Sequence, residues 1–159
     1  MSGFLDNLLN LYQNEMERHR NRPFLRAVMA ACANVAMADG SVGLRERVRL
    51  DQVMDTLDAL KIYDPHEGVD LFNDFVDGIK SNPRDGHQQA LEAIRAEAGE
   101  DPEKAMLLVR ICLAVSEVEG KIPLTEQIEI VGLCSQLGVQ PDNVGLYTDS
   151  TAKDISTPD

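Results

Sequence analysis

Two loops of the same sequence pattern lie eighty residues apart in this chain. In each loop an acidic residue and a glycine follow an apolar run, as Asp39-Gly40 and Glu119-Gly120, and a glutamate stands seven places after the acid, at Glu46 and Glu126. The flanking residues that also agree at this offset are Cys32 with Cys112, Val35 with Val115, Leu44 with Leu124, and Leu57 with Leu137. This agreement predicts an internal duplication of a helix-loop-helix unit within one domain, because two copies are too few for a solenoid.

The composition favours a soluble, all-α domain. The chain has 159 residues, of which 43% are hydrophobic and 26% charged, as in ordinary globular domains. Only 4% are aromatic and none is Trp, so aliphatic residues and Met must fill the core, which suits helices better than a β-sandwich. We expect residues 1–147 to form the domain, and the polar, aperiodic residues 148–159 to form a flexible tail.

The net charge of −12 limits the partners that the chain can have. Such a surface repels nucleic acid and attracts cations or a basic protein face. Three cysteines, Cys32, Cys112 and Cys134, lie in apolar runs without a C-x-x-C pair, so we expect buried, reduced thiols in a cytoplasmic protein. The longest apolar run, 27–38, is too short to cross roughly 30 Å of hydrocarbon, so we expect no membrane insertion.

Hydrophobic periodicity and the positions of proline and glycine predict seven helices. Their expected ranges are 4–19, 23–38, 44–60, 65–81, 86–98, 102–118 and 123–137, with a short turn near 141–146. The second helix is apolar nearly all round, which predicts that it is buried. Asp64-Pro65 and Asp101-Pro102 have the pattern of a capping residue followed by a first-turn proline.

The first predicted helix, 4–19, is amphipathic. Its apolar face carries Phe4, Leu5, Leu8, Leu9, Tyr12 and Met16. A membrane-surface helix would need more basic residues on its polar face, although three arginines follow near its end. We therefore expect this helix to pack on the rest of the domain.

The two loops also match the second half of an EF-hand calcium loop, in which the glycine makes a sharp turn and the last glutamate chelates the ion. An EF-hand needs oxygen donors at loop positions 1 and 3 as well. These positions hold Val35 and Met37 in the first copy, and Val115 and Glu117 in the second. Too few donors remain, which excludes a standard EF-hand.

Two interpretations of the acids remain open. In the first, Asp39 and Glu46 share one divalent ion with carbonyl groups and waters, and Glu119 and Glu126 hold a second. Hard oxygen ligands favour Ca²⁺, Mg²⁺ or Mn²⁺, and so few carboxylates predict dissociation constants on the order of 10⁻⁴ to 10⁻³ M. In the second, the two glutamates only stabilise the first turns of their helices, where carboxylates are favoured.

No catalytic pattern stands out in the chain. The three histidines, His19, His66 and His87, have no zinc-binding spacing. Neither a glycine-rich phosphate loop nor a G-x-S-x-G motif occurs. We therefore expect a protein that is not an enzyme.

Several motifs occur in a defined order along the chain. They are Gly3-Phe4-Leu5, Arg20-Asn21-Arg22-Pro23-Phe24, the run 35–40 with Glu46 after it, Leu60-Lys61-Ile62-Tyr63-Asp64, Leu71-Phe72-Asn73, and the second copy over 109–138. In this order they resemble the TerB family of tellurite-resistance proteins over nearly the full length. The combination is specific, although each motif alone is not.

The resemblance implies a compact seven-helix bundle with pseudo-two-fold symmetry and a cytoplasmic role in resistance to tellurite and related stress. It implies divalent-cation binding through acidic loop residues, and docking beside a membrane protein of the same system, TerC, without a known reaction. Such a partner would place the chain at the inner membrane. Asp39, Glu46 and Glu126 fall on the family's acidic positions, whereas Glu119 replaces the usual aspartate and its loop is less acidic than the family pattern.

Overall fold

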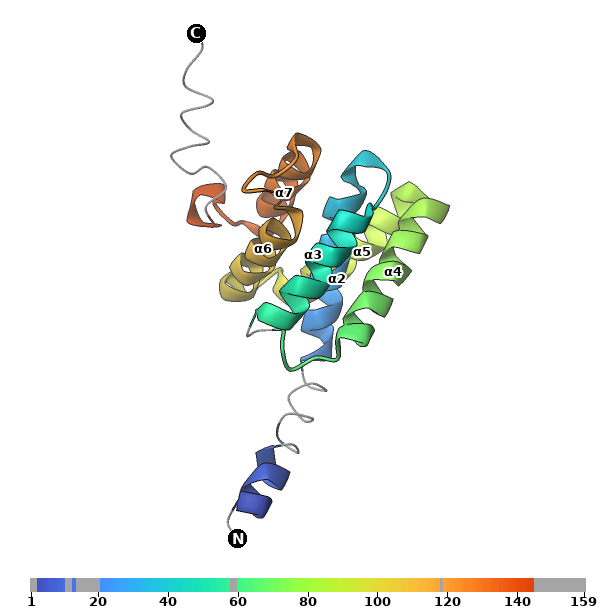
Figure 1. Cartoon of the computed structure of the whole chain (residues 1–159). Helices are drawn as coiled ribbons and strands as arrows, with labels where there is room; N and C mark the ends of the chain where they lie inside the picture. Colours follow the sequence, from blue (N-terminus) through green and yellow to red (C-terminus); the bar gives the residue numbers. More distant parts are fainter. Residues whose placement is uncertain (1–2, 11–12, 14–20, 58–59, 118, 145–159) are drawn as a thin grey trace.

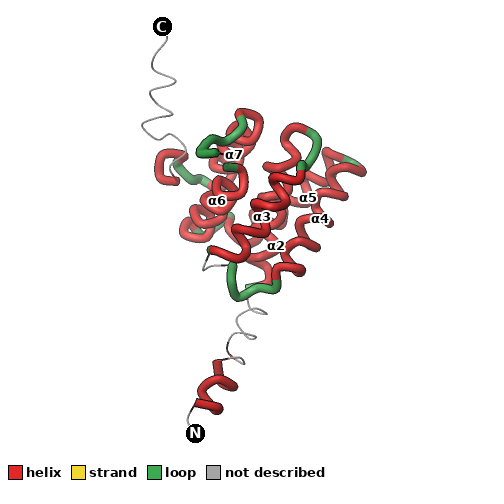
Figure 2. Tube along the Cα trace, viewed as in Figure 1, coloured by secondary structure: helices red, strands yellow, loops and turns green. Residues whose placement is uncertain are grey.

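The computed structural model describes residues 3–10, 13, 21–57, 60–117 and 119–144, and the regular structure of these residues is helical (Figure 1). The helices are α2 (Arg22–Ala36), α3 (Leu44–Thr56), α4 (Pro65–Ser81), α5 (Pro83–Ala98), α6 (Pro102–Ser116) and α7 (Leu124–Leu137), with 3₁₀ turns η1 (Met37–Asp39) and η2 (Pro141–Val144). No β-strand occurs within these ranges, and loops alone join the helices (Figure 2). The predicted all-α class is confirmed.

Helix α2 lies at the centre of the bundle. It packs against α4, α5, α6 and α7, and its residues from Phe24 to Ala36 are buried, with the exception of Arg26. The sequence explains this position, because a helix that is apolar on every side has no face suited to water. Its alanines let neighbouring helices approach closely, and each fully buried larger side chain, such as Leu25 or Met29, stabilises the fold by roughly 1.5–3 kcal/mol.

Pairs of Asp or Asn with a following proline begin three helices. The capping side chains of Asp64, Asn82 and Asp101 accept hydrogen bonds from backbone N–H groups of His66, Asp85 and Lys104, at 3.0, 3.3 and 3.2 Å. The predicted caps at the first and third positions are confirmed. The Asn82-Pro83 pair ends α4, as predicted, and also begins α5, three residues before the predicted start, because a proline in the first turn needs no N–H partner.

Three helices end earlier than the periodicity predicted. Helix α2 gives way to η1 after Ala36, α3 ends at Thr56 because Leu57 is extended, and α6 ends at Ser116. In each case the apolar pattern continues past the last helical residue, so hydrophobic periodicity alone does not locate the end.

The helix pairs α2–α3 and α6–α7 correspond to the two predicted copies. In each pair a glycine with positive φ, Gly40 at 94° and Gly120 at 79°, lies between the helices. The second helix begins four residues after that glycine in both copies, at Leu44 and Leu124. The duplication itself stays a prediction.

Residues 3–10 are helical, but the structure does not show the packing that we expected of them. Phe4, Leu5, Leu8 and Leu9 are between 54% and 73% exposed, and the segment stands apart from the bundle (Figure 1). Most of the remainder of the predicted helix 4–19 and the whole predicted tail 148–159 lie outside the described residues. Among the helices that are described, none combines the length and the apolar character needed to cross a membrane.

The close approach of α5 to α4 gives a test of the packing. A Cβ atom at Gly86 would lie 2.5 Å from the Cα of Ile79, whereas one at Gly132 in α7 would meet nothing within 4 Å. We expect Gly86→Ala to lower the free energy of unfolding by about 1–3 kcal/mol, because a backbone clash must be relieved. Gly132→Ala should leave it unchanged or raise it by up to about 1 kcal/mol, because alanine favours a helix. Urea unfolding measures the free energy of unfolding of both variants. Equal changes in the two variants would contradict the close approach of α5 to α4 at Gly86.

Candidate metal site

The first loop carries two carboxylates between α2 and α3. Asp39 ends η1 just before the left-handed Gly40, is exposed, and accepts a hydrogen bond at Oδ1 from the Ser41 N–H at 3.2 Å. Glu46 lies in the first turn of α3, where its Oε2 accepts from the Gly43 N–H at 2.7 Å. Glu46 therefore stabilises the start of its helix, as the capping interpretation predicted, and each carboxylate retains one further oxygen.

The second loop differs at the position that matters for capping. Glu126 lies in the first turn of α7, as Glu46 does in α3, but the residue that precedes the helix is Pro123, which has no N–H to donate. Glu126 is only 4% exposed, and its Oε1 has no hydrogen-bond partner among the described residues. Capping therefore does not account for this buried carboxylate.

Electrostatics show that the two loops meet. Burial, and after it the charges of Glu46 and Asp39, together raise the pKa of Glu126 from its usual 4.5 to about 7. The helix N-terminus favours the ionised form, but only by roughly 0.3–1 kcal/mol. A rise of this size in pKa corresponds to about 3 kcal/mol, so desolvation and repulsion outweigh the helix dipole.

Three of the four predicted ligands thus belong to one corner of the bundle. The turn η1, which ends at Asp39, packs against α7, which carries Glu126. The fourth, Glu119, is exposed in a left-handed backbone conformation with φ of 53°, and it is not among the charges that shift the pKa of Glu126. The sequence led us to expect one pair of acidic residues in each loop. The structure instead brings together acidic residues from both loops, Asp39, Glu46 and Glu126. We call this group of three carboxylates the acid corner.

The chemistry of the acid corner suits a hard cation, because carboxylate oxygens are the ligands that Ca²⁺, Mg²⁺ and Mn²⁺ prefer. The unpartnered, buried Oε1 of Glu126 is an oxygen that an ion would satisfy. Within the described part of the chain, however, no three or more His, Cys, Asp or Glu side chains stand in an arrangement that holds a metal. The carboxylates would have to move toward one another around an ion.

The sequence contained a signal for Glu126 that periodicity did not reveal. At the offset of eighty residues, Gly43 corresponds to Pro123 and Glu46 to Glu126. Replacing the residue before the helix by proline removes the N–H that a first-turn glutamate would bind. The comparison of the two copies at this one position therefore distinguishes a capping glutamate from an unpartnered one.

The prediction for the three cysteines was incomplete. The three cysteines are buried, as predicted, but the sequence did not show that they lie together. A hydrogen bond with Cys32, together with burial and the nearby Cys134, raises the pKa of Cys112 well above its usual value. The raised pKa keeps the Cys112 thiol protonated, which makes it a poor nucleophile and a poor metal ligand.

A contact between Asn34 and His87, which the sequence analysis missed, lies in a cleft between α2, α5 and α7. Asn34, which is buried within the apolar α2, places its Oδ1 2.8 Å from Nδ1 of His87 in α5. The cleft has a volume of about 310 Å³, and Arg84, Glu129 and Gln136 also line it. No pattern in the sequence predicts that Asn34 and His87 lie together.

The raised pKa of Glu126 makes stability depend on pH. Between pH 4.5 and about 7 the folded chain keeps a proton on Glu126 that the unfolded chain has lost. Rising pH through this window therefore lowers the free energy of unfolding, by up to about 3 kcal/mol in total. We expect Glu126→Gln to be more stable than the wild type at pH 8 by about 1–3 kcal/mol, with the difference vanishing near pH 5.

Urea unfolding of the wild type, Glu126→Gln and the exposed control Glu119→Gln at pH 5 and pH 8 measures this effect. For each variant the change in the free energy of unfolding between pH 5 and pH 8 is compared with that of the wild type, which cancels the contribution of the groups that the two share. A pH dependence of Glu126→Gln equal to that of the wild type would show that Glu126 is ionised in the folded chain at pH 5.

Comparison with known proteins supports the resemblance that the motifs gave. A "Tellurium resistance protein TerB" from Alcaligenes sp is 26% identical over 97 residues, which cover 61% of this chain and 79% of that protein. No solved structure matches the chain significantly. Residues 25–147 match the family described as Tellurite resistance protein TerB. The chain therefore belongs to the TerB family.

Proposed function

We propose that this chain is a non-enzymatic tellurite-resistance protein whose acid corner binds one divalent cation and whose surface docks on a protein of the same resistance system. Family membership supports the role in tellurite resistance. The observation that supports the cation is the buried Oε1 of Glu126, which lacks a partner and lies where two other carboxylates repel it. Burying a charge without a partner is costly, and a cation would remove that cost.

In the proposed site, Glu126 supplies the buried oxygen, while Asp39 and Glu46 supply the oxygens that their backbone hydrogen bonds leave free. Backbone carbonyls and waters would complete the coordination of Ca²⁺, Mg²⁺ or Mn²⁺. A site with three carboxylates that must move together should bind with a dissociation constant on the order of 10⁻⁴ to 10⁻³ M. The ion would couple the loop after α2 to the start of α7.

The partner is the second part of the proposal. The resemblance suggests the membrane protein TerC, and a chain with a net charge of −12 would approach a basic face of any such protein. Neutralising the acid corner would change the charge that the chain presents there. Cation occupancy would thus tune docking.

A purely structural interaction module is the second candidate. The hydrogen bonds from Gly43 to Glu46 and from Ser41 to Asp39 favour it, because both carboxylates already stabilise their own loop. In that case the acidic surface binds a basic partner and no cation takes part. Partner binding would weaken with added salt in both cases, so only a cation titration separates the two candidates.

Calorimetric titration with Ca²⁺ and with Mn²⁺ at pH 7.5 tests the site. We expect saturable binding by the wild type and a loss of affinity of about 10-fold or more in Glu126→Gln and in Asp39→Asn with Glu46→Gln, because each removes carboxylate ligands. Glu119→Gln is the matched control and should bind like the wild type. Because Glu126 must lose its proton, wild-type affinity should rise from pH 6 to pH 8.

A flat titration for the wild type would remove the cation from the proposal and leave the structural module. Binding that Glu119→Gln abolishes but Glu126→Gln does not would place any ion in the second loop alone.

A further inference from the structure

The exposed large apolar side chains of the described residues occur in only two groups. One is the helical segment 3–10, with Phe4, Leu5, Leu8 and Leu9. The other lies at the starts of α3 and α7, with Leu44, Val48, Leu124 and Ile128. Exposed apolar side chains that lie together, as Leu44 and Val48 do in one groove, mark interaction sites.

The group on the bundle repeats between the two copies. Leu44 and Leu124 are the first residues of α3 and α7, and Val48 and Ile128 follow one turn later on the same face of each helix. Their exposed fractions lie between 46% and 78%. Packing within the bundle does not explain these residues, because they face water.

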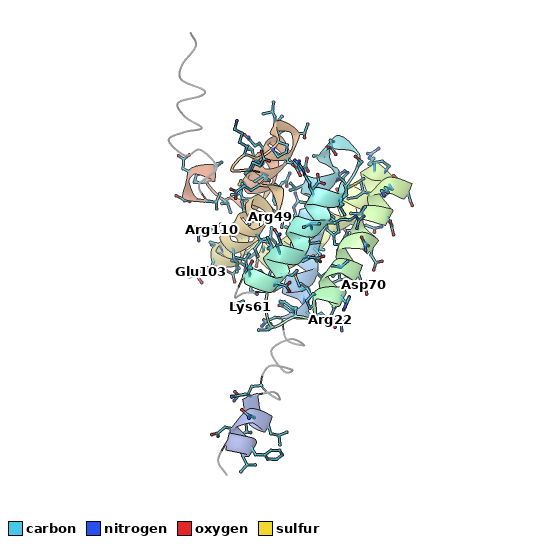
Figure 3. All side chains as sticks on the ribbon, viewed as in Figure 1. Arg22, Arg49, Lys61, Asp70, Glu103 and Arg110 are labelled. Carbon is cyan, nitrogen blue, oxygen red and sulfur yellow. The ribbon has the colours of Figure 1, made fainter. Side chains whose placement is uncertain are left out.

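On α3 the exposed pair forms part of an apolar groove. Leu44 and Val48 line a groove of about 300 Å³, together with Arg45, Arg49, Gln52 and Glu117. Arg49 fixes α3 against α6, since its Nε donates to the Ala114 carbonyl at 2.7 Å and its guanidinium lies 3.7 Å from the Glu117 carboxylate. Figure 3 shows Arg49 where these two helices meet. Arg45 is the second cationic side chain of the groove, on the same helix.

The N-terminal segment complements the groove in shape and in charge. Phe4 and Leu8 are one helical turn apart, as Leu44 and Val48 are, so two apolar ridges of equal spacing can face each other. The one charged side chain of residues 3–10 is Asp6, and the groove offers Arg45 beside the ion pair of Arg49 with Glu117. The acidic side chain of the segment thus complements Arg45 of the groove.

We propose that the groove on α3 binds the N-terminal helical segment of a second copy of this chain, with Phe4 and Leu8 set against Leu44 and Val48. In this structure the segment of the same copy does not make this contact (Figure 1). It lies beyond the end of the bundle where α2 begins, whereas α3 starts at the opposite end, about 22 Å away along α2 (Figure 1). Two copies that exchange their segments form a closed pair, as in domain swapping.

This assembly does not require a cation, and it goes beyond the proposed function. Arg45 lines the groove next to Glu46 of the acid corner, so the two sites are neighbours on α3. The pairing is nevertheless tested on the full chain in the presence of a chelator. A negative result for the pairing therefore says nothing against the cation site, and a negative cation titration says nothing against the pairing.

Sedimentation velocity over a hundredfold range of concentration tests the pairing. We expect a concentration-dependent dimer for the wild type. The double variants Phe4→Asp with Leu8→Asp, and Leu44→Asp with Val48→Asp, should each weaken the dimer by about 30-fold or more, because central apolar contacts dominate such interfaces. Leu124→Asp with Ile128→Asp is the matched control and should dimerise like the wild type. All six side chains are exposed, so circular dichroism should show the native helix content in every variant.

A wild type that stays monomeric throughout would overturn the proposal. So would a dimer that survives the Leu44 and Val48 substitutions, or one that only the Leu124 and Ile128 substitutions weaken.

Disulfide trapping then identifies the occupant of the groove. Leu8→Cys mixed with Val48→Cys should give a linked heterodimer on mild oxidation, because the native cysteines are buried. Leu8→Cys mixed with Gln89→Cys, on the exposed surface of α5, is the control and should give none. A Leu8→Cys, Val48→Cys double variant that forms a disulfide within one chain at low concentration would show that each groove binds its own segment and would overturn the proposal. Flotation of a monomeric wild type with vesicles of anionic phospholipid would overturn it in favour of a membrane contact.

Discussion

The burial of α2 determines how the other helices are arranged. A helix that is apolar on all sides needs other helices around it, and α4, α5, α6 and α7 provide that cover. Its C-terminal end is therefore the place where the chain leaves the core and reaches the surface. The turn η1 and Asp39 lie there, in contact with α7. The central helix thus determines where the first acidic loop meets the second.

The acid corner combines two glutamates that are equivalent in sequence and different in chemistry. Glu46 has a backbone N–H to bind, and its role in helix stability is clear. Glu126 follows a proline, lacks that partner, and is buried beside two other carboxylates. An unpartnered carboxylate destabilises the folded chain at neutral pH. Buried polar groups without partners are rare in stable folds and point to an unfilled interaction.

Much of the fold could be predicted from the sequence because its signals are local. Proline after Asp locates the starts of α4 and α6, and the all-apolar pattern of α2 locates the core. The ends of α2, α3 and α6 could not be predicted, because apolar residues continue past them. The exposed face of residues 3–10 was also unpredictable, since an amphipathic pattern does not say which surface covers it.

The candidate site was predictable in its residues but not in its grouping. The spacing of acidic residues identified Asp39, Glu46, Glu119 and Glu126 as candidate ligands. It paired the two acids within each loop, because the sequence alone does not show which loops lie close together in space. Contact between η1 and α7 joins acids from both loops and leaves Glu119 exposed. The cluster of Cys32 with Cys112 and the pairing of Asn34 with His87 arise in the same way, from contacts between helices far apart in the chain.

Carbon-13 NMR titration of the Glu126 carboxyl group reports the protonation of this one group, and so tests whether the carboxylate is buried without a partner. In the absence of divalent ions we expect a pKa near 7. Saturating Ca²⁺ should lower it, since a bound cation favours the ionised form. A pKa near 4.5, unchanged by Ca²⁺, would contradict both the buried, unpartnered carboxylate and the cation site.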